Sequence, residues 1–224
     1  MGKELTIGGA IVWTACYFGV MLLYTAVDVA VWRKVFPKTS SWLNTVTIAL
    51  CACGFLALLK RAGYAIPLLS NITLSGVLMA LGCSALFYLV LDHGLDPLLE
   101  RAFPASERAY QETIQSLRKA PIPSFIQISI LAPVMEEALM RGLILHGLIP
   151  AYGAAVALLV SAALFALLHF NMVQTLSAFL CGVVLGLLYL QTGSVGVCII
   201  AHCGYNVLSY VKMISERDAE DGRE

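Results

Sequence analysis

Long apolar stretches constrain this chain more than any other feature of its sequence. A helix needs about 20 mostly apolar residues to cross a lipid bilayer. Seven segments meet this requirement, and once they are assigned little length is left for a soluble domain. We therefore predict an all-α fold, a polytopic transmembrane helical bundle of about seven spans, in which residues 1–224 form a single integral-membrane domain. The predicted spans are residues 8–32, 42–59, 70–91, 123–149, 153–170, 173–190 and 194–214.

The charge content agrees with a membrane location. Hydrophobic residues make up 59% of the chain and charged residues only 12%, whereas a soluble domain has about 25% charged residues. The 14 Lys and Arg balance the 14 Asp and Glu, so there is no basic surface that could follow a phosphate backbone. The predicted partner is the lipid bilayer, and nucleic acid is excluded.

One polar segment, residues 92–123, interrupts the apolar pattern. Asp96 and Pro97 have the form of a helix cap followed by a first-turn proline, and predict a helix start there. After Pro104 the apolar positions recur at helical spacing opposite charged ones, which predicts an amphipathic interfacial helix on the membrane surface. An ordinary solvated linker helix is the alternative. The apolar positions of this helix are Tyr110, Ile114 and Leu117.

The distribution of Lys and Arg between loops predicts the orientation, because cytoplasmic loops are enriched in these residues. With seven spans, most of them fall on the side that holds residues 33–38, the segment 92–123 and the C-terminus. The opposite side receives Lys3, Lys60 and Arg61. We therefore expect a cytoplasmic C-terminus.

Few ionisable side chains lie inside the predicted spans, where each costs about 2.5–3.5 kcal/mol even on a lenient insertion scale. Asp28 lies near a helix end and can pair with Arg33. Glu136, Glu137 and Arg141 instead lie near the middle of the span 123–149. Glu137 and Arg141 are four residues apart and can pair on one face, whereas Glu136 points about 100° away. Glu136 therefore needs a polar partner from another helix, unless all three side chains only stabilise helix packing.

Two later spans can supply that partner. Phe165 and His169 share one helix face at a four-residue spacing, and His202 and Asn206 do the same. One buried cluster formed by three spans would satisfy all of these polar groups at once.

The three motifs, E-E-x-x-x-R, F-x-x-x-H and H-x-x-x-N on successive apolar helices, resemble the CPBP (Abi) intramembrane protease family, which includes the type II CAAX prenyl proteases. The resemblance covers residues 125–210, which we take as the catalytic core region. It implies an integral protein of the cytoplasmic membrane of a prokaryote that acts as an endopeptidase. The implied substrate is a peptide bond near the C-terminus of a membrane-associated protein or peptide, such as a prenylated protein or a sorting tail. The implied catalytic residues are Glu136, His169, His202 and Asn206, with structural support from Glu137, Arg141 and Phe165.

The residue types fit peptide hydrolysis. A carboxyl shielded from bulk solvent, such as Glu136, can act as general base toward a water molecule that His169 helps to orient. By resemblance, His202 and Asn206 would face the developing oxyanion. Glu136, His169 and His202 could instead bind a divalent metal such as Zn²⁺, although the H-E-x-x-H signature is absent. The sequence leaves open whether the cofactor is a metal or none.

Two other classes of function remain. A proton-coupled transporter also places Glu, His and Asn at mid-membrane, and a non-catalytic scaffold or bacteriocin-immunity protein could keep the same fold. Two local predictions concern access and packing. We expect the connection 169–174 to dip into the bundle, with Asn171 and Gln174 lining a water path, and we expect Gly182 and Gly186 to let a neighbouring helix approach closely.

Overall fold

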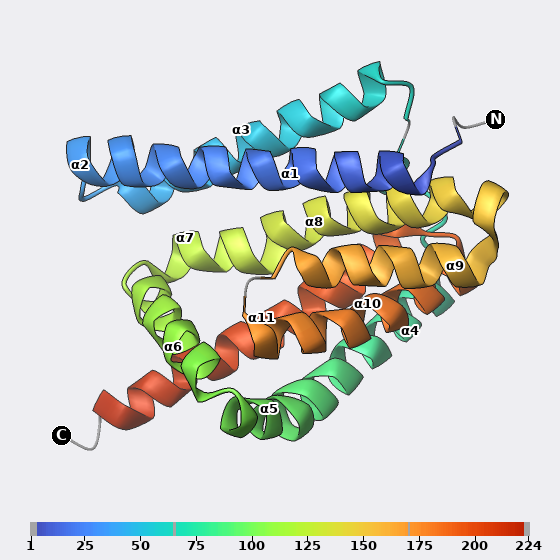
Figure 1. Cartoon of the computed structure of the whole chain (residues 1–224). Coiled ribbons are helices and arrows are strands. Elements are labelled where there is room, and N and C mark those ends of the chain that lie inside the picture. The colour runs from blue at the N-terminus through green and yellow to red at the C-terminus, as the bar shows by residue number, and fades with distance from the viewer. Residues whose placement is uncertain (1–3, 65, 170, 222–224) are drawn as a thin grey trace.

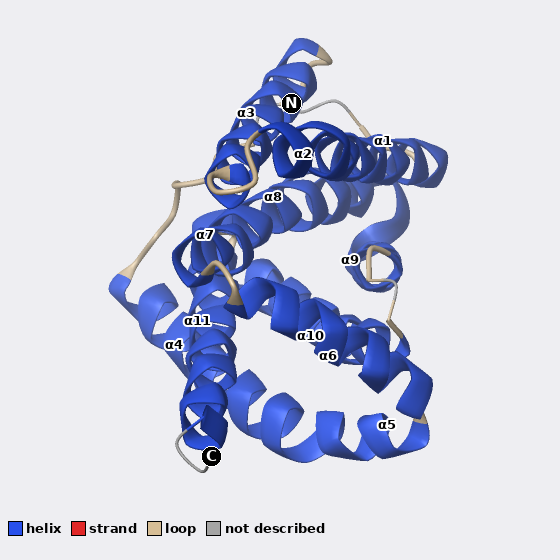
Figure 2. Cartoon of the chain, turned by 90° about the vertical axis from the view of Figure 1, so that its left-hand side faces the viewer, coloured by secondary structure: helices blue, strands red, loops and turns tan. Residues whose placement is uncertain are grey.

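A computed structural model describes residues 4–64, 66–169 and 171–221, and helix is the only regular secondary structure in these ranges (Figure 2). The all-α prediction is therefore confirmed. Several π-helical segments, labelled η, continue α-helices without a break. The helices of the N-terminal half are α1 (Ile7–Val27), η1 (Asp28–Trp32), α2 (Arg33–Val35), α3 (Ser40–Arg61), α4 (Leu74–Phe87), η2 (Tyr88–Leu95), α5 (Asp96–Ala102) and α6 (Pro104–Arg118). Those of the C-terminal half are α7 (Pro121–Ile126), η3 (Gln127–Leu131), α8 (Ala132–Glu137), η4 (Ala138–Leu145), α9 (His146–Leu167), α10 (Met172–Thr192) and α11 (Val195–Asp221).

Within the described ranges, six helices are long and apolar enough to cross a membrane, against the seven spans expected from the sequence. The difference lies in Pro121–Leu167, a run of 47 residues that would extend far beyond a hydrocarbon core of about 30 Å. Gly153 interrupts this run with φ 77° and ψ 164°, a conformation open to glycine because it has no Cβ. Figure 1 shows the chain doubling back there, so α9 returns beside α8. The two predicted spans 123–149 and 153–170 are thus the two legs of one hairpin.

The long helices lie roughly along one direction in two groups (Figure 1). α1 and α3 form an antiparallel pair on one side, and the remaining long helices pack beneath them. Helix α6 runs across one end of the bundle, between α5 and α7. The most deeply buried element is η4, whose residues are all buried, so the centre of the fold directly follows the two glutamates of α8.

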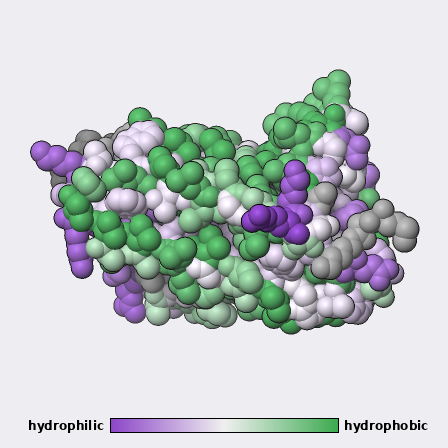
Figure 3. All heavy atoms as spheres, turned by 90° about the horizontal axis from the view of Figure 1, so that it is seen from above, coloured by the Kyte–Doolittle hydropathy of each residue, from purple (hydrophilic) through white to green (hydrophobic). Residues whose placement is uncertain are grey.

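The outer surface is apolar. Leu22, Leu50 and Leu78, on α1, α3 and α4, are each more than half exposed, and Figure 3 shows hydrophobic residues over most of the face that α1 and α3 form. Water-facing surfaces rarely expose continuous apolar patches of this extent. These side chains therefore suit contact with lipid tails.

The polar segment 92–123 differs from the sequence-based expectation. Asp96 does not start a new helix, because η2 continues into α5 and the helical run Leu74–Ala102 is unbroken. Its carboxylate accepts a hydrogen bond from Ser177 of α10 instead of capping a helix end. The predicted amphipathic helix does form, as α6, with Ile114 buried; the side chain of Tyr110 lies outside the described part of the chain.

Two glycines of α10 allow α9 to approach closely, as the sequence predicted. A Cβ on Gly182 would lie 3.1 Å from Ala162 Cα, and one on Gly186 would clash with Leu158. The close approach also brings the carbonyl of Gly182 to 3.0 Å from a guanidinium nitrogen of Arg141. The glycine pair thus positions an acceptor for a buried charge.

Candidate active site

The glutamate helix is shaped by a proline. Pro133 has no N–H, so it cannot donate to a carbonyl of the preceding turn. In the π-helical register of η3, where Ala132 N–H bonds to Gln127 O, the carbonyl of Ile128 would be the acceptor for residue 133. Asn206 of α11 supplies the missing donor, since its Nδ2 lies 2.9 Å from Ile128 O. This bond fixes Asn206 against the glutamate helix and uses one of its two amide hydrogens.

Glu137 and Arg141 form a fully buried ion pair, as their four-residue spacing predicted. Arg141 Nη1 lies 2.7 Å from Glu137 Oε1, and both side chains have 0% exposure. The guanidinium also donates to Gly182 O and lies 5.1 Å from the centre of the Phe165 ring. Four neighbouring elements, α8, η4, α9 and α10, are therefore joined at this one cation.

His202 lies between the two glutamates. Its Nδ1 is 2.9 Å from Glu137 Oε1, and its Nε2 is 3.8 Å from Glu136 Oε2. Glu137 is paired with a guanidinium and, as a carboxylate, can only accept, so Nδ1 carries the hydrogen of the shorter contact. Nε2 is then the ring atom that His202 presents to Glu136. The sequence indicated that Glu136 would need a partner from another helix but gave no sign that Glu137 would hold the same imidazole.

Phe165 separates the two histidines. Its ring centre lies 5.1 Å from that of His169 and 5.8 Å from that of His202, edge-on in both cases. The contact with His169 agrees with the shared helix face that the four-residue spacing of Phe165 and His169 predicts. His169 Nδ1 lies 3.1 Å from the carbonyl of Phe165, so Nδ1 donates and Nε2 is left to face other partners.

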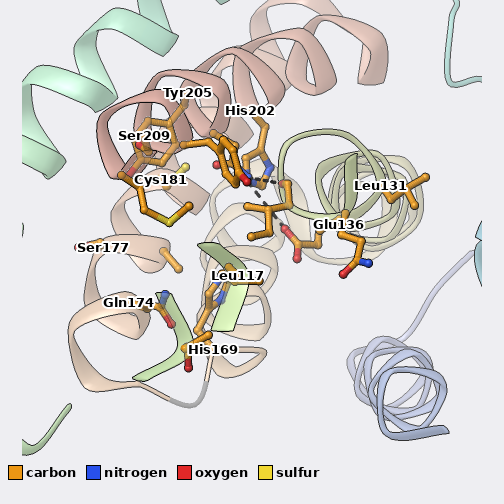
Figure 4. Close-up of a pocket in the computed structure, with 18 of the residues that line it drawn as sticks. Leu117, Leu131, Glu136, His169, Gln174, Ser177, Cys181, His202, Tyr205 and Ser209 are labelled. Carbon is orange, nitrogen blue, oxygen red and sulfur yellow. Dashed lines mark hydrogen bonds and ion pairs between the residues drawn. The ribbon is translucent and has the colours of Figure 1, made fainter. Parts of the chain in front are cut away.

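The four predicted catalytic side chains line one cavity of about 690 Å³. Figure 4 shows Glu136 and His202 next to one another, with His169 and Gln174 on another part of the wall. The volume falls in the range of about 300–1,000 Å³ that ligand sites commonly have. Asn171, in contrast, is absent from the lining: its Oδ1 caps the first turn of α10 and its Nδ2 bonds to Ser106 O. The prediction that Asn171 borders a water path is therefore wrong, because capping uses its side chain.

The arrangement of these side chains bears on the alternative metal site. Glu136 and His202 face one another, but within the described residues no three His, Cys, Asp or Glu side chains gather closely enough to hold an ion. His169, the third predicted ligand, lines the cavity without joining that pair. A hydrolytic zinc site needs three protein ligands around one point, so these side chains as placed do not fit such a metal.

The lining of the cavity changes from one group of helices to another. The part lined by α1, α3 and the glutamate helix, called the apolar branch below, is mostly apolar but also includes Tyr17, Tyr24, Asn44 and Gln127. The part lined by η2, α5, α6 and α11, called the polar branch below, carries most of the charged side chains. The apolar side chains of the apolar branch are Val20, Met21, Ile48, Ala52, Leu131 and Met135. Polar and charged residues of the other branch are Asp92, Asp96, Glu100, Gln111, Arg118, Ser209 and Lys212.

Comparison with known proteins identifies the family of this region. Residues 118–208 match the model of the family described as type II CAAX prenyl endopeptidase Rce1-like. The match includes all three motifs and confirms the resemblance seen in the sequence. Together with the six apolar helices of the described residues, the match supports an integral membrane protein whose residues 118–208 have a CAAX-type intramembrane protease fold. Searches of curated proteins and of solved structures found no match.

Proposed function

We propose that this protein is an intramembrane endopeptidase that uses Glu136 and His202 to hydrolyse a peptide bond near the C-terminus of a prenylated, membrane-associated protein or peptide. The family of residues 118–208 supports the class of protein. One observation carries the assignment of residues, namely the separation of 3.8 Å between Glu136 Oε2 and His202 Nε2 inside the cavity.

This separation suits a shared water molecule. It is too long for a direct hydrogen bond, and a polar contact of this length is often bridged by water. A water molecule could lie about 2.8 Å from both Glu136 Oε2 and His202 Nε2 and so form a hydrogen bond with each. Such a water could donate one hydrogen to Glu136 while its oxygen stays open toward a substrate carbonyl.

The proposed reaction needs one proton acceptor and one stabiliser of negative charge. Glu136 takes a proton from the water, whose oxygen forms a bond to the scissile carbonyl carbon. The resulting oxyanion accepts hydrogen bonds from His202 Nε2–H of the doubly protonated ring and from the remaining amide hydrogen of Asn206. The C–N bond then breaks, and Glu136 returns the proton to the departing amine. One water is consumed, and a new carboxylic acid and a new amine are formed.

The other motif residues have supporting roles in this scheme. Glu137 holds the imidazole of His202 through Nδ1, and Arg141 holds Glu137 in place. His169, whose Nδ1 is held by Phe165 O, lines another part of the same cavity, where it can contact the bound substrate. No step passes through a metal ion, because the donor groups do not converge on one point.

The apolar branch supports a lipidated substrate. It begins beside Glu136, at Met135 and Leu131, and continues to Val20 and Ile48 on the two helices that are least buried by the rest of the chain. A prenyl chain entering from the bilayer would occupy this branch without losing its apolar surroundings. The adjoining peptide bond would then reach Glu136.

Purified protein in liposomes tests this proposal. A peptide that ends in a prenylated Cys and three further residues should be cut after the Cys, with the released tripeptide detected by mass spectrometry. The same peptide without the prenyl group should be cut far more slowly, and Glu136→Gln should abolish cleavage of both. If wild type and Glu136→Gln give identical peptides, the protease assignment is wrong and a scaffold or immunity role is favoured. Proton flux that depends on Glu136 in the same liposomes would favour a transporter instead.

A further inference from the structure

The polar branch carries charged groups of both signs. Among the described residues that line the cavity, Arg118 and Lys212 are the only Lys or Arg side chains. Asp92, Asp96 and Glu100, spaced four residues apart along η2 and α5, line the same branch. An anionic group in this branch would be attracted to the two cations and repelled by the three carboxylates, so it could bind only where N–H donors of a cation reach it.

Lys212 reaches back along α11 toward the active site. Its Nζ donates to the backbone carbonyl of Asp92 at 3.0 Å. The carboxylate of the same Asp92 accepts from Tyr205 and Ser209, which lie closer to His202 on α11. A helical side chain tilts toward the helix N-terminus, and these contacts place the ammonium near the level of residue 209. One of its three N–H groups is used by Asp92 O, which leaves two for a ligand.

Arg118 approaches the same place from α6. Its Nη2 donates to Met213 O, 2.7 Å away, on the residue that follows Lys212. The carbonyl is uncharged, so this contact does not neutralise the guanidinium. Two cations from different helices therefore border one end of the polar branch.

The distance from this cation pair to the proposed catalytic water corresponds to a short peptide. Residue 209 is seven positions after His202, a rise of about 10 Å along an α-helix. Three residues of extended chain span about 10–11 Å. A tripeptide that starts at the scissile bond could therefore place its end at Lys212.

We propose that Lys212, assisted by Arg118, binds the free C-terminal α-carboxylate of the substrate and thereby sets the cleavage position three residues from the chain end. This inference rests on the proposed protease function. A prenyl group in the apolar branch and a carboxylate at Lys212 would hold the substrate from both sides of the scissile bond. A tetrapeptide with its lipidated residue first has the spacing that fits both sites.

Blocking the carboxylate tests the inference without altering the protein. Wild type should cleave a prenylated peptide with a free C-terminal carboxylate about ten-fold or more faster, in kcat/KM, than the same peptide ending in a carboxamide, because a charge-assisted hydrogen bond is lost. The loss should appear mainly in KM. A peptide extended by one residue should be cut as poorly as the amide. Equal cleavage of acid and amide would overturn the inference and leave the protease assignment intact.

Variants locate the effect at Lys212. Lys212→Met should remove most of the preference for the acid, and Lys212→Arg should keep it. Lys60→Met, at the exposed end of α3 outside the cavity, should behave as wild type. Binding of the same two peptides to the Glu136→Gln protein gives a readout that does not need turnover. If Glu136→Gln binds acid and amide equally, the carboxylate site is refuted. If it prefers the acid but wild type cuts neither, the site stands and the protease assignment fails.

Discussion

Glu137 Oε1 lies 2.9 Å from His202 Nδ1 and joins the glutamate helix to the last helix of the bundle. Because the same oxygen also accepts from Arg141, one carboxylate fixes both a buried cation and an imidazole. The ring is thereby turned so that Nε2 points at Glu136. Glu137 thus does more than stabilise its own helix. It also determines which nitrogen of His202 faces the proposed water.

Glu137→Gln should lower kcat by about 10²–10⁴-fold, because a carboxylate that holds a catalytic imidazole has an effect of up to this size when replaced by an amide. The substitution keeps the shape of the side chain but offers His202 a group that can donate as well as accept. The measurement is turnover of the prenylated peptide in liposomes. Glu112→Gln, on the exposed side of α6 and outside the cavity, is the matched control and should retain wild-type turnover. Wild-type kcat in Glu137→Gln would show that the contact is only structural.

Arg141→Met should destabilise the folded protein by about 3–5 kcal/mol, because it leaves the buried Glu137 carboxylate without its cation. The double variant Glu137→Gln/Arg141→Met should recover part of this loss, since the remaining side chains carry no unpaired charge. Unfolding in detergent, followed by circular dichroism, measures both. Losses that simply add in the double variant would contradict the ion-pair interpretation.

Gly182→Ala should also lower stability, by about 1–3 kcal/mol, because the new methyl group would press on α9 and move the Gly182 carbonyl away from Arg141. Gly82→Ala on α4 is the comparison, since a Cβ there meets nothing within 4 Å. That variant should be neutral or slightly stabilising, because alanine favours helix over glycine. Equal effects of the two substitutions would show that close packing at Gly182 is unimportant.

The sequence predicted the membrane bundle and the three motif helices because both depend on local patterns. Apolar length identified the spans, and four-residue spacing identified the faces that carry Glu137 with Arg141 and His202 with Asn206. Other features depended on partners distant in the sequence. Asp96 seemed to start a helix, but Ser177 of α10 engages its carboxylate and the helix continues. In the same way, Asn206 donates to the carbonyl of Ile128, which is left without a backbone donor because Pro133 has no N–H. No single motif of the sequence indicates this contact.

Metal removal should leave turnover unchanged. Glu136 and His202 face one another, but His169 does not lie close enough to them to act as a third metal ligand. We therefore expect general-base catalysis by Glu136 without a metal ion. Protein treated with a strong chelator and then dialysed should cleave the prenylated peptide at the untreated rate. A loss of activity that added Zn²⁺ restores would contradict this mechanism and would require the three side chains to move together.

The most direct test of the central claim is a double-variant cycle on Glu136 and His202, with cleavage of the prenylated peptide as the readout. If both side chains act on one water, Glu136→Gln and His202→Gln should each lower kcat by about 10²–10³-fold or more. The double variant should then be about as active as the poorer single variant, because residues that act as a unit are not additive. Losses that multiply, or a Glu136→Gln protein that still cleaves at the wild-type rate, would contradict the account.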